Sequence, residues 1–213
     1  MSRSDWFRST EWTPQVRAAF LGKLERCRKA SRKAQYARIQ ALYLQEDIGT
    51  QYALHEAIDL LTMVCERWPE QPDKQSVLGQ LATCHVALGR ITEGISFFRS
   101  SFAARRKDPG IQTMHHLDFS LLVASEPFPD LFGEALAVLE EFPPAPFPYH
   151  RFQYYAAIAL IYHQLKLENA DSLARFALQE AAATHSGSAR HPDFCLGAGK
   201  YASLVPALEE IAA

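Results

Sequence analysis

Long apolar runs and strand-like alternation are both absent from the 213-residue sequence. No stretch approaches the roughly 18 apolar residues that can cross a bilayer, and the N-terminal MSRSDWFRSTEW lacks the apolar segment of a secretory signal. We therefore expect a cytoplasmic protein without a membrane partner. No run alternates Val, Ile, Thr or Tyr with period two, so the sequence argues against a sheet and predicts an all-α fold.

Cysteine is scarce as well. The four cysteines stand far apart and form no C-x-x-C pair, which excludes the density of a disulfide scaffold. We expect reduced thiols at Cys27, Cys65, Cys84 and Cys195. Cys65 and Cys84 fall in neighbouring predicted hairpins and are expected to act as small buried hydrophobes.

The signatures of catalysis are missing: there is no Gly-rich phosphate loop, no G-x-S-x-G elbow and no H-E-x-x-H helix. His115 and His116 are adjacent, so on a helix they point about 100° apart and cannot both bind one metal. His191 and Cys195 have neither an orienting acid nor an oxyanion hole. His85 is expected to be a packed, hydrogen-bonded histidine. The sequence thus predicts no enzyme, no metal and no cofactor.

A helix is predicted from Pro14, because Thr13 can cap the free N–H groups and proline at the first position has no N–H to leave unpaired. Val16, Phe20 and Leu24 then form one apolar stripe, which we expect to dock on the rest of the chain. Ahead of this helix, large aromatic side chains are expected to anchor the N-terminal segment: Trp6, Phe7 and Trp12.

Helical hairpins follow, about four of them. The clearest has a first helix capped by Asp73, a turn at Gly89 and a second helix capped by Thr92. The hairpin before it begins near Ser31 and has a longer turn near Gly49. The small and large positions of the clearest copy are Leu78, Leu81, Ala82, His85, Gly89, Gly94 and Phe98.

The third and fourth hairpins are recognised by prolines and caps. The third is expected to begin at Asp108-Pro109 and to turn through Pro127. Asp130 is the predicted cap of its second helix, and the second helix of the fourth hairpin is expected to start after Asn169.

The segments around the fourth hairpin are also predicted from proline and glycine. An extended spacer is expected before it, because proline disfavours helix at Pro143, Pro144, Pro146 and Pro148. Residues 185–199 are predicted to form a loop, and 200–212 a last helix that Pro206 kinks or delays.

This hairpin pattern resembles the tetratricopeptide repeat, a helix pair of about 34 residues with the signature W-x2-L-G-x2-Y, A-x3-F and P. The chain looks like the divergent, single-domain kind found in bacteria, with the resemblance covering roughly residues 31–184. It implies one solenoid domain with the following parts: an N-terminal segment and helix in 1–30, helix pairs in 31–184, and a loop and capping helix in 185–213. Small residues at Ala57, Gly94 and Ala135 should then sit where paired helices touch.

The resemblance also implies a binding groove, built from the first helix of each pair. The residues that match its inward positions are Gln35, Arg38, Leu42, Gln45, Ser76, Thr83, Val86, Gln153, Leu160 and His163. Only Arg38 matches the basic residues with which some members clamp a chaperone carboxylate, so that partner is not expected. We predict a non-enzymatic adaptor that grips a peptide or helix of another protein, and the pattern also allows a homodimer.

Charge is unevenly distributed, although the net charge is only −2. Residues 1–38 carry ten Lys and Arg against three acidic residues. Either this basic segment leans on an acidic body, or it forms a patch for an anionic partner: Lys23, Arg26, Arg28, Lys29, Arg32 and Lys33. The alternative function is therefore nucleic-acid binding or regulation through the N-terminal helix. A pI of about 6.4 and the lack of interleaved aromatics argue against a nucleic acid.

Overall fold

The computed structural model describes residues 6–110, 112–126, 128–194 and 196–213. Within these ranges the chain forms ten α-helices and short 3-10 and π turns, and no strand. The predicted all-α class is confirmed. The predicted turn residue Pro127 and the candidate residue Cys195 lie outside the described residues.

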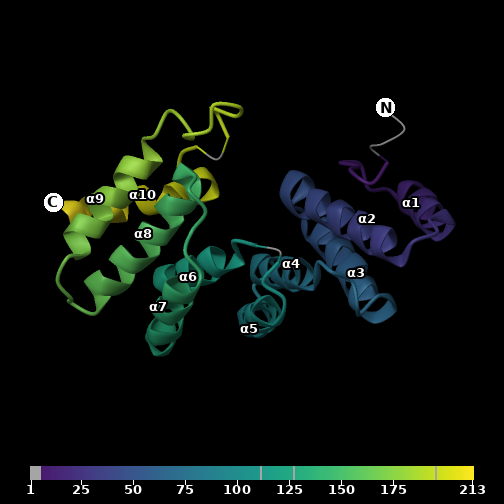
Figure 1. Cartoon of the computed structure of the whole chain (residues 1–213), viewed down its shortest axis with the longest axis horizontal. Helices are drawn as coiled ribbons and strands as arrows, with labels where there is room; N and C mark the ends of the chain where they lie inside the picture. Colours follow the sequence, from purple (N-terminus) through teal and green to yellow (C-terminus); the bar gives the residue numbers. More distant parts are fainter. Residues whose placement is uncertain (1–5, 111, 127, 195) are drawn as a thin grey trace. The chain divides into compact units, whose positions relative to one another are not determined.

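The helices gather into two compact units, Met1–His115 and His116–Ala213 (Figure 1). Each unit is treated by itself below, and the assignment of 1–213 to one domain stays a prediction. None of the helices in the described ranges is long and apolar enough to cross a membrane.

The first unit is a succession of helices in which each one packs on the next along the chain. In order they are α1 (Pro14–Arg26), α2 (Ala30–Tyr43), α3 (Gln51–Arg67), α4 (Lys74–Ala87) and α5 (Ile91–Lys107). One π-helical turn, η1 (Leu44–Ile48), extends α2 until Gly49 ends it at φ +61°. The extra residues that the sequence places between α2 and α3 are absorbed by this turn.

Threonine caps two of these helices. Thr13 Oγ1 accepts a hydrogen bond from the Val16 N–H at 3.3 Å, as predicted for α1. Thr50 Oγ1 accepts from the Ala53 N–H at 3.2 Å and starts α3 in the same way.

Three other predicted caps of this unit are wrong. Asp73 precedes α4 but caps no N–H group, because its carboxylate forms an ion pair with Arg38. α5 begins at Ile91, one residue ahead of Thr92. Asp108 does not start a helix; it follows the end of α5, and its Oδ1 accepts from the Gly110 N–H at 3.3 Å in a turn.

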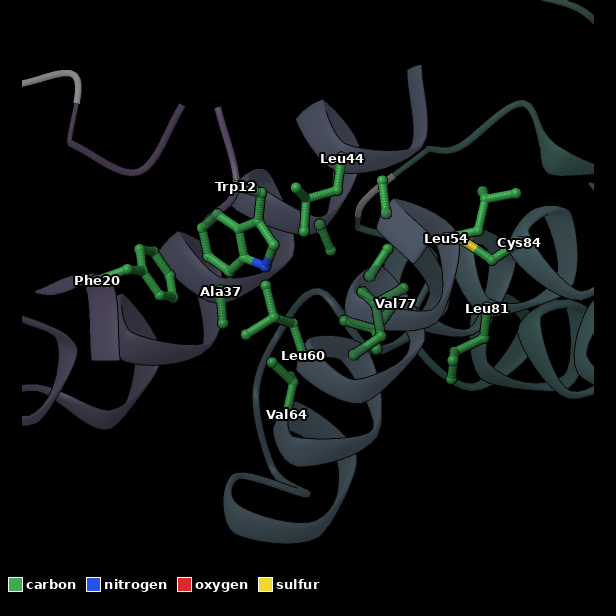
Figure 2. Packing of buried hydrophobic residues seen from close by; sticks show 14 of the residues in the cluster. Trp12, Phe20, Ala37, Leu44, Leu54, Leu60, Val64, Val77, Leu81 and Cys84 are labelled. Atoms are coloured by element: carbon green, nitrogen blue, oxygen red, sulfur yellow. The ribbon is translucent and has the colours of Figure 1, made fainter. Parts of the chain in front are cut away.

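The core of the first unit joins α1 to α2, α3 and α4. Phe20 and Leu24 are buried in it and Val16 packs against it, so the predicted docking of α1 is confirmed. The Trp12 ring lies beside Ala37 and Leu60 in Figure 2, with its indole Nε1 donating to Glu56 at 2.9 Å. Trp6 and Phe7 pack against the same core, so all three predicted anchors are in place.

Close helix contact makes a small residue necessary at Gly94. A Cβ at this position would lie 2.6 Å from Val86 Cγ2 and 3.1 Å from the Ala82 carbonyl oxygen, both on α4. Ala57 and Ala135 are fully buried, as expected for positions between packed helices. Gly89 makes the predicted turn between α4 and α5 at φ +75°.

The second unit continues the helical pattern. Its elements are α6 (His115–Ser125), η2 (Pro129–Leu131), α7 (Phe132–Glu141), α8 (Pro148–Gln164), α9 (Ala170–Ala181), η3 (Gly199–Leu204) and α10 (Val205–Ala212). α8 pairs with α9, and α10 packs on both of them with Leu208 fully buried.

Two boundary predictions in this unit are wrong and two are confirmed. Asp130 lies inside η2 and caps nothing, since α7 begins at Phe132. Pro148 begins α8 instead of extending the spacer, because proline fits the first helical position. α9 starts directly after Asn169, and the last helix is delayed to Val205.

Candidate functional site

Two polar contacts tie α2 and α4 together. Arg38 Nε lies 3.3 Å from Asp73 Oδ2, at the start of α4. Gln45 Nε2, in η1, donates to Thr83 Oγ1 at 2.7 Å, near the end of α4. Because the earlier residue of one segment meets the earlier residue of the other, α2 and α4 run in the same general direction and are joined by these side chains.

Around the contact between Gln45 and Thr83, some side-chain polar atoms are hydrogen-bonded and others are not. Thr83 Oγ1 accepts from Gln45 and lies 3.0 Å from the carbonyl oxygen of Gln80, to which it can donate. Gln45 Oε1 and Gln80 Oε1 are buried and accept no hydrogen bond from any described residue. Such buried acceptors each carry a desolvation cost.

His115 begins α6 but is the last residue of the first unit, in which it lies against α4. A Cβ on Gly79 would lie 1.9 Å from Cδ2 of His115, so the imidazole ring covers the α4 backbone where glycine leaves room for it. His116 is buried elsewhere, with its ring 5.9 Å from that of Phe142. The two adjacent histidines thus face different surroundings.

The predicted groove residues divide between the two units. Those of the first unit, which we call the α2–α4 face, are Gln35, Arg38, Leu42, Gln45, Ser76, Thr83 and Val86. On this face Gln35 is exposed, Ser76 is buried and the others are half-buried. In the second unit, Gln153 and Leu160 of α8 are buried and His163 is exposed. The side chains open to a partner are therefore fewer than the ten predicted.

The N-terminal basic segment is only partly engaged with the body. Arg17 Nε donates to Glu56 Oε2 at 2.7 Å. Lys33 Nζ and Arg67 Nη1 both contact Glu25, at 3.2 Å and 2.9 Å. The hydrogen bond and charge of Lys33, with a smaller effect of Arg67, lower the pKa of the exposed Glu25 carboxyl.

Among the described residues, the remaining basic residues of the predicted patch have no acidic partner of this kind. Lys23 Nζ lies 5.7 Å from the centre of the Trp6 ring. Four are exposed and form no ion pair within the described part of the chain: Arg26, Arg28, Lys29 and Arg32. Of the predicted basic patch, the exposed residues without an ion pair in the described chain therefore lie at the connection between α1 and α2.

Two cysteines of the first unit, Cys65 and Cys84, are poor nucleophiles. Burial raises the pKa of the Cys84 thiol to about 12. Burial also raises the pKa of the half-buried Cys65 thiol. Both thiols thus stay protonated at neutral pH, which is what small buried hydrophobes do.

His85 is packed, as predicted, but the predicted hydrogen bond of its ring Nδ1 is absent among the described residues. Its ring lies 5.1 Å from that of Phe97, and its buried Nδ1 has no hydrogen-bond partner among the described residues. Burial is the main cause that lowers the pKa of His85, and the nearby Arg90 charge adds to it.

The second unit contains a polar cluster that the sequence analysis did not predict. The Tyr201 hydroxyl donates to Asp118 Oδ1 at 2.5 Å, and Lys200 Nζ lies 3.1 Å from the same oxygen. Burial, with the charge of Asp118, raises the pKa of Tyr201. Asp118 lies on α6 and Tyr201 on η3, and no local sequence pattern links two residues so far apart.

Two hollows lie on the first unit. One, of about 780 Å³, is bordered by the ends of α4 and α5 and includes Gln75, Leu78 and Lys107. A smaller one, of about 400 Å³, lies between α1 and α3 and includes Leu21 and Met63. Neither hollow contains residues of the predicted groove.

No three His, Cys, Asp or Glu side chains within the described ranges lie close enough together to hold a metal ion. Comparison of the chain with protein-family models, with curated proteins and with solved structures finds no match.

Proposed function

We propose that this chain is a non-enzymatic interaction module, a tetratricopeptide-like solenoid that binds a peptide or helix of another protein on its first helices. The observation that supports the proposal best is the parallel alignment of α2 and α4 through Arg38–Asp73 and Gln45–Thr83. Helices that are first in their pairs and lie side by side build the wall of such a groove.

A corresponding contact in the second unit supports the same arrangement. Gln164 Nε2, at the end of α8, donates to the Ala124 carbonyl oxygen of α6 at 2.8 Å. α6 and α8 are the predicted first helices of the third and fourth pairs. Direct contact between first helices thus recurs in each unit.

The chemistry of the exposed groove residues favours a mixed polar and apolar partner. Gln35 offers an amide, and the half-buried Leu42 and Val86 offer apolar contacts. Arg38 is already paired with Asp73, so it is not a free cation for a carboxylate. A peptide or amphipathic helix fits this surface better than an acidic chain end.

Site-specific photo-cross-linking tests this proposal. A photoreactive amino acid is introduced at Gln35 or Leu42 on the α2–α4 face, and in a control at the exposed Thr62 of α3. We expect the first two positions to form adducts with the same protein and Thr62 to form none. Leu42→Glu should abolish the adduct formed from Gln35, because a charge replaces the apolar contact. Circular dichroism establishes that this variant is folded.

The proposal fails if folded Leu42→Glu retains every specific adduct, or if Thr62 captures the same protein as Gln35. It also fails if neither groove position captures a protein that a tagged wild-type chain retains.

A further inference from the structure

The connection between α1 and α2 carries a compact group of positive charges. We call it the basic turn and define it as Arg26, Arg28, Lys29 and Arg32. All four side chains are exposed, and none forms an ion pair within the described part of the chain. The neighbouring acid Glu25 is already held by Lys33 and Arg67, so it does not neutralise the turn.

The basic turn is held in place by the core on both sides. Leu24, just before it, is 1% exposed, and Ala34, just after it, is 2% exposed. Within the turn, the Cys27 N–H donates to the Leu24 carbonyl at 3.0 Å and the Arg32 N–H to that of Lys29 at 3.1 Å. The charges are therefore presented on a fixed backbone, which lowers the entropy lost when an anion binds.

The side chains of the turn suit phosphate. Three of the four are arginine, whose planar guanidinium can donate two hydrogen bonds to one phosphate group. The residues between them are Cys27, Ala30 and Ser31, which supply no large apolar side chain. A protein interface needs such an anchor in its centre. The turn therefore fits a phosphodiester backbone better than an acidic protein.

The nearby aromatic rings are not available for stacking on bases. Phe7 stacks on Tyr36 at 4.4 Å between ring centres, and Arg8 lies over the Phe7 ring at 5.2 Å. Trp6 meets the edge of Tyr36 at 5.2 Å, with Lys23 over its ring. Because these faces are occupied, contact with a nucleic acid would involve its phosphates and not its bases.

We propose that the basic turn binds the phosphodiester backbone of double-stranded nucleic acid without reading its sequence. The near-neutral charge of the whole chain does not oppose this, because at physiological salt charges are screened beyond about 8 Å. A local group of four exposed cations therefore acts on its own. This site uses none of the α2–α4 face and is independent of the proposed function.

Fluorescence anisotropy with a labelled 20-base-pair DNA duplex of mixed sequence tests the inference, using the full chain. With four phosphate contacts, the affinity should fall by about a hundredfold between 50 and 200 mM NaCl. Arg28→Glu combined with Lys29→Glu should weaken binding at least about tenfold and reduce the salt dependence by about half, since two of four contacts are lost. A duplex of unrelated sequence should bind equally well.

The matched control is Lys107→Glu combined with Arg190→Glu. Both residues are exposed and lie outside the basic turn, and the pair changes the net charge by the same amount. This control should bind like the wild type. The inference is overturned by absence of duplex binding at 50 mM NaCl, or by equal weakening in the control. Competition by a polyglutamate peptide as strong as that by unlabelled duplex would identify an acidic protein instead. Binding to phosphatidylserine vesicles without duplex binding would identify a membrane surface.

Discussion

Small side chains decide how closely the helices of this chain approach one another. Gly94 shows this best, because even a methyl group there would meet Val86 of α4 at 2.6 Å. Ala57 on α3 and Ala135 on α7 are fully buried, so we expect a larger side chain at either position to crowd its neighbours.

Enlarging Ala57 should destabilise the first unit. We expect Ala57→Leu to lower the free energy of unfolding by about 1–3 kcal/mol, because it overpacks a fully buried contact. Urea denaturation followed by circular dichroism measures the change. Ala19→Leu, at an exposed position of α1, is the control for helix propensity and should change stability by less than about 0.5 kcal/mol. An unaltered midpoint in Ala57→Leu would mean that the residue is not at a tight helix contact.

At the scale of helices and turns, apolar periodicity was a better guide than capping residues, of which Thr13 was confirmed and Asp73 was wrong. The apolar stripe of Val16, Phe20 and Leu24 predicted both a helix and the face that it buries. Asp73, by contrast, precedes a helix as a cap should, yet its carboxylate turns to Arg38. A cap competes with every other partner of the same side chain, and partners distant in sequence cannot be read from a local pattern.

The candidate site was likewise predictable only as far as local sequence patterns reach. Helical spacing indicated which residues share a face, but burial of Ser76, Gln153 and Leu160 depends on packing that spacing does not contain. For the basic segment, composition could not tell which charges find an acid. Only the fold places Glu56 beside Arg17 and Glu25 beside Lys33 and Arg67.

The C-terminal turn η3 is fastened to α6 by the hydrogen bond from Tyr201 to Asp118. We expect Tyr201→Phe to cost about 1 kcal/mol, because it removes a largely buried hydrogen bond. A double-mutant cycle with Asp118→Ala, which removes the acceptor, should give a coupling energy of about 0.5–3 kcal/mol, measured by urea denaturation. Lys200→Ala should have a smaller effect, because exposed ion pairs contribute little. Additive effects of Tyr201→Phe and Asp118→Ala would show that this bond does not hold η3.

At the scale of the whole molecule, each unit contains a histidine whose neutral form is favoured by folding. His85 in the first unit and His150 in the second both have a lowered pKa, with burial as the main cause. Arg90 adds to this effect at His85 while Glu93 opposes it, and Asp118 opposes it at His150. The two units should therefore respond to acid in the same direction.

Acidification should lower the stability of the chain below the ordinary histidine pKa of 6.5. In this range the unfolded chain takes up protons at His85 and His150 that the folded chain does not yet bind, so stability falls as the pH falls. Protonation of Glu25, whose pKa is also lowered in the folded state, adds a further loss below its ordinary value of 4.5.

Thermal unfolding at pH 7.5, 6.5 and 5.5 measures the effect as a decreasing Tm. The variant His85→Gln with His150→Gln should have a flatter profile over the same range, because neither position can take up a proton. A Tm that rises between pH 6.5 and 5.5, or an equally steep fall in this variant, would mean that buried neutral histidines do not set the acid sensitivity.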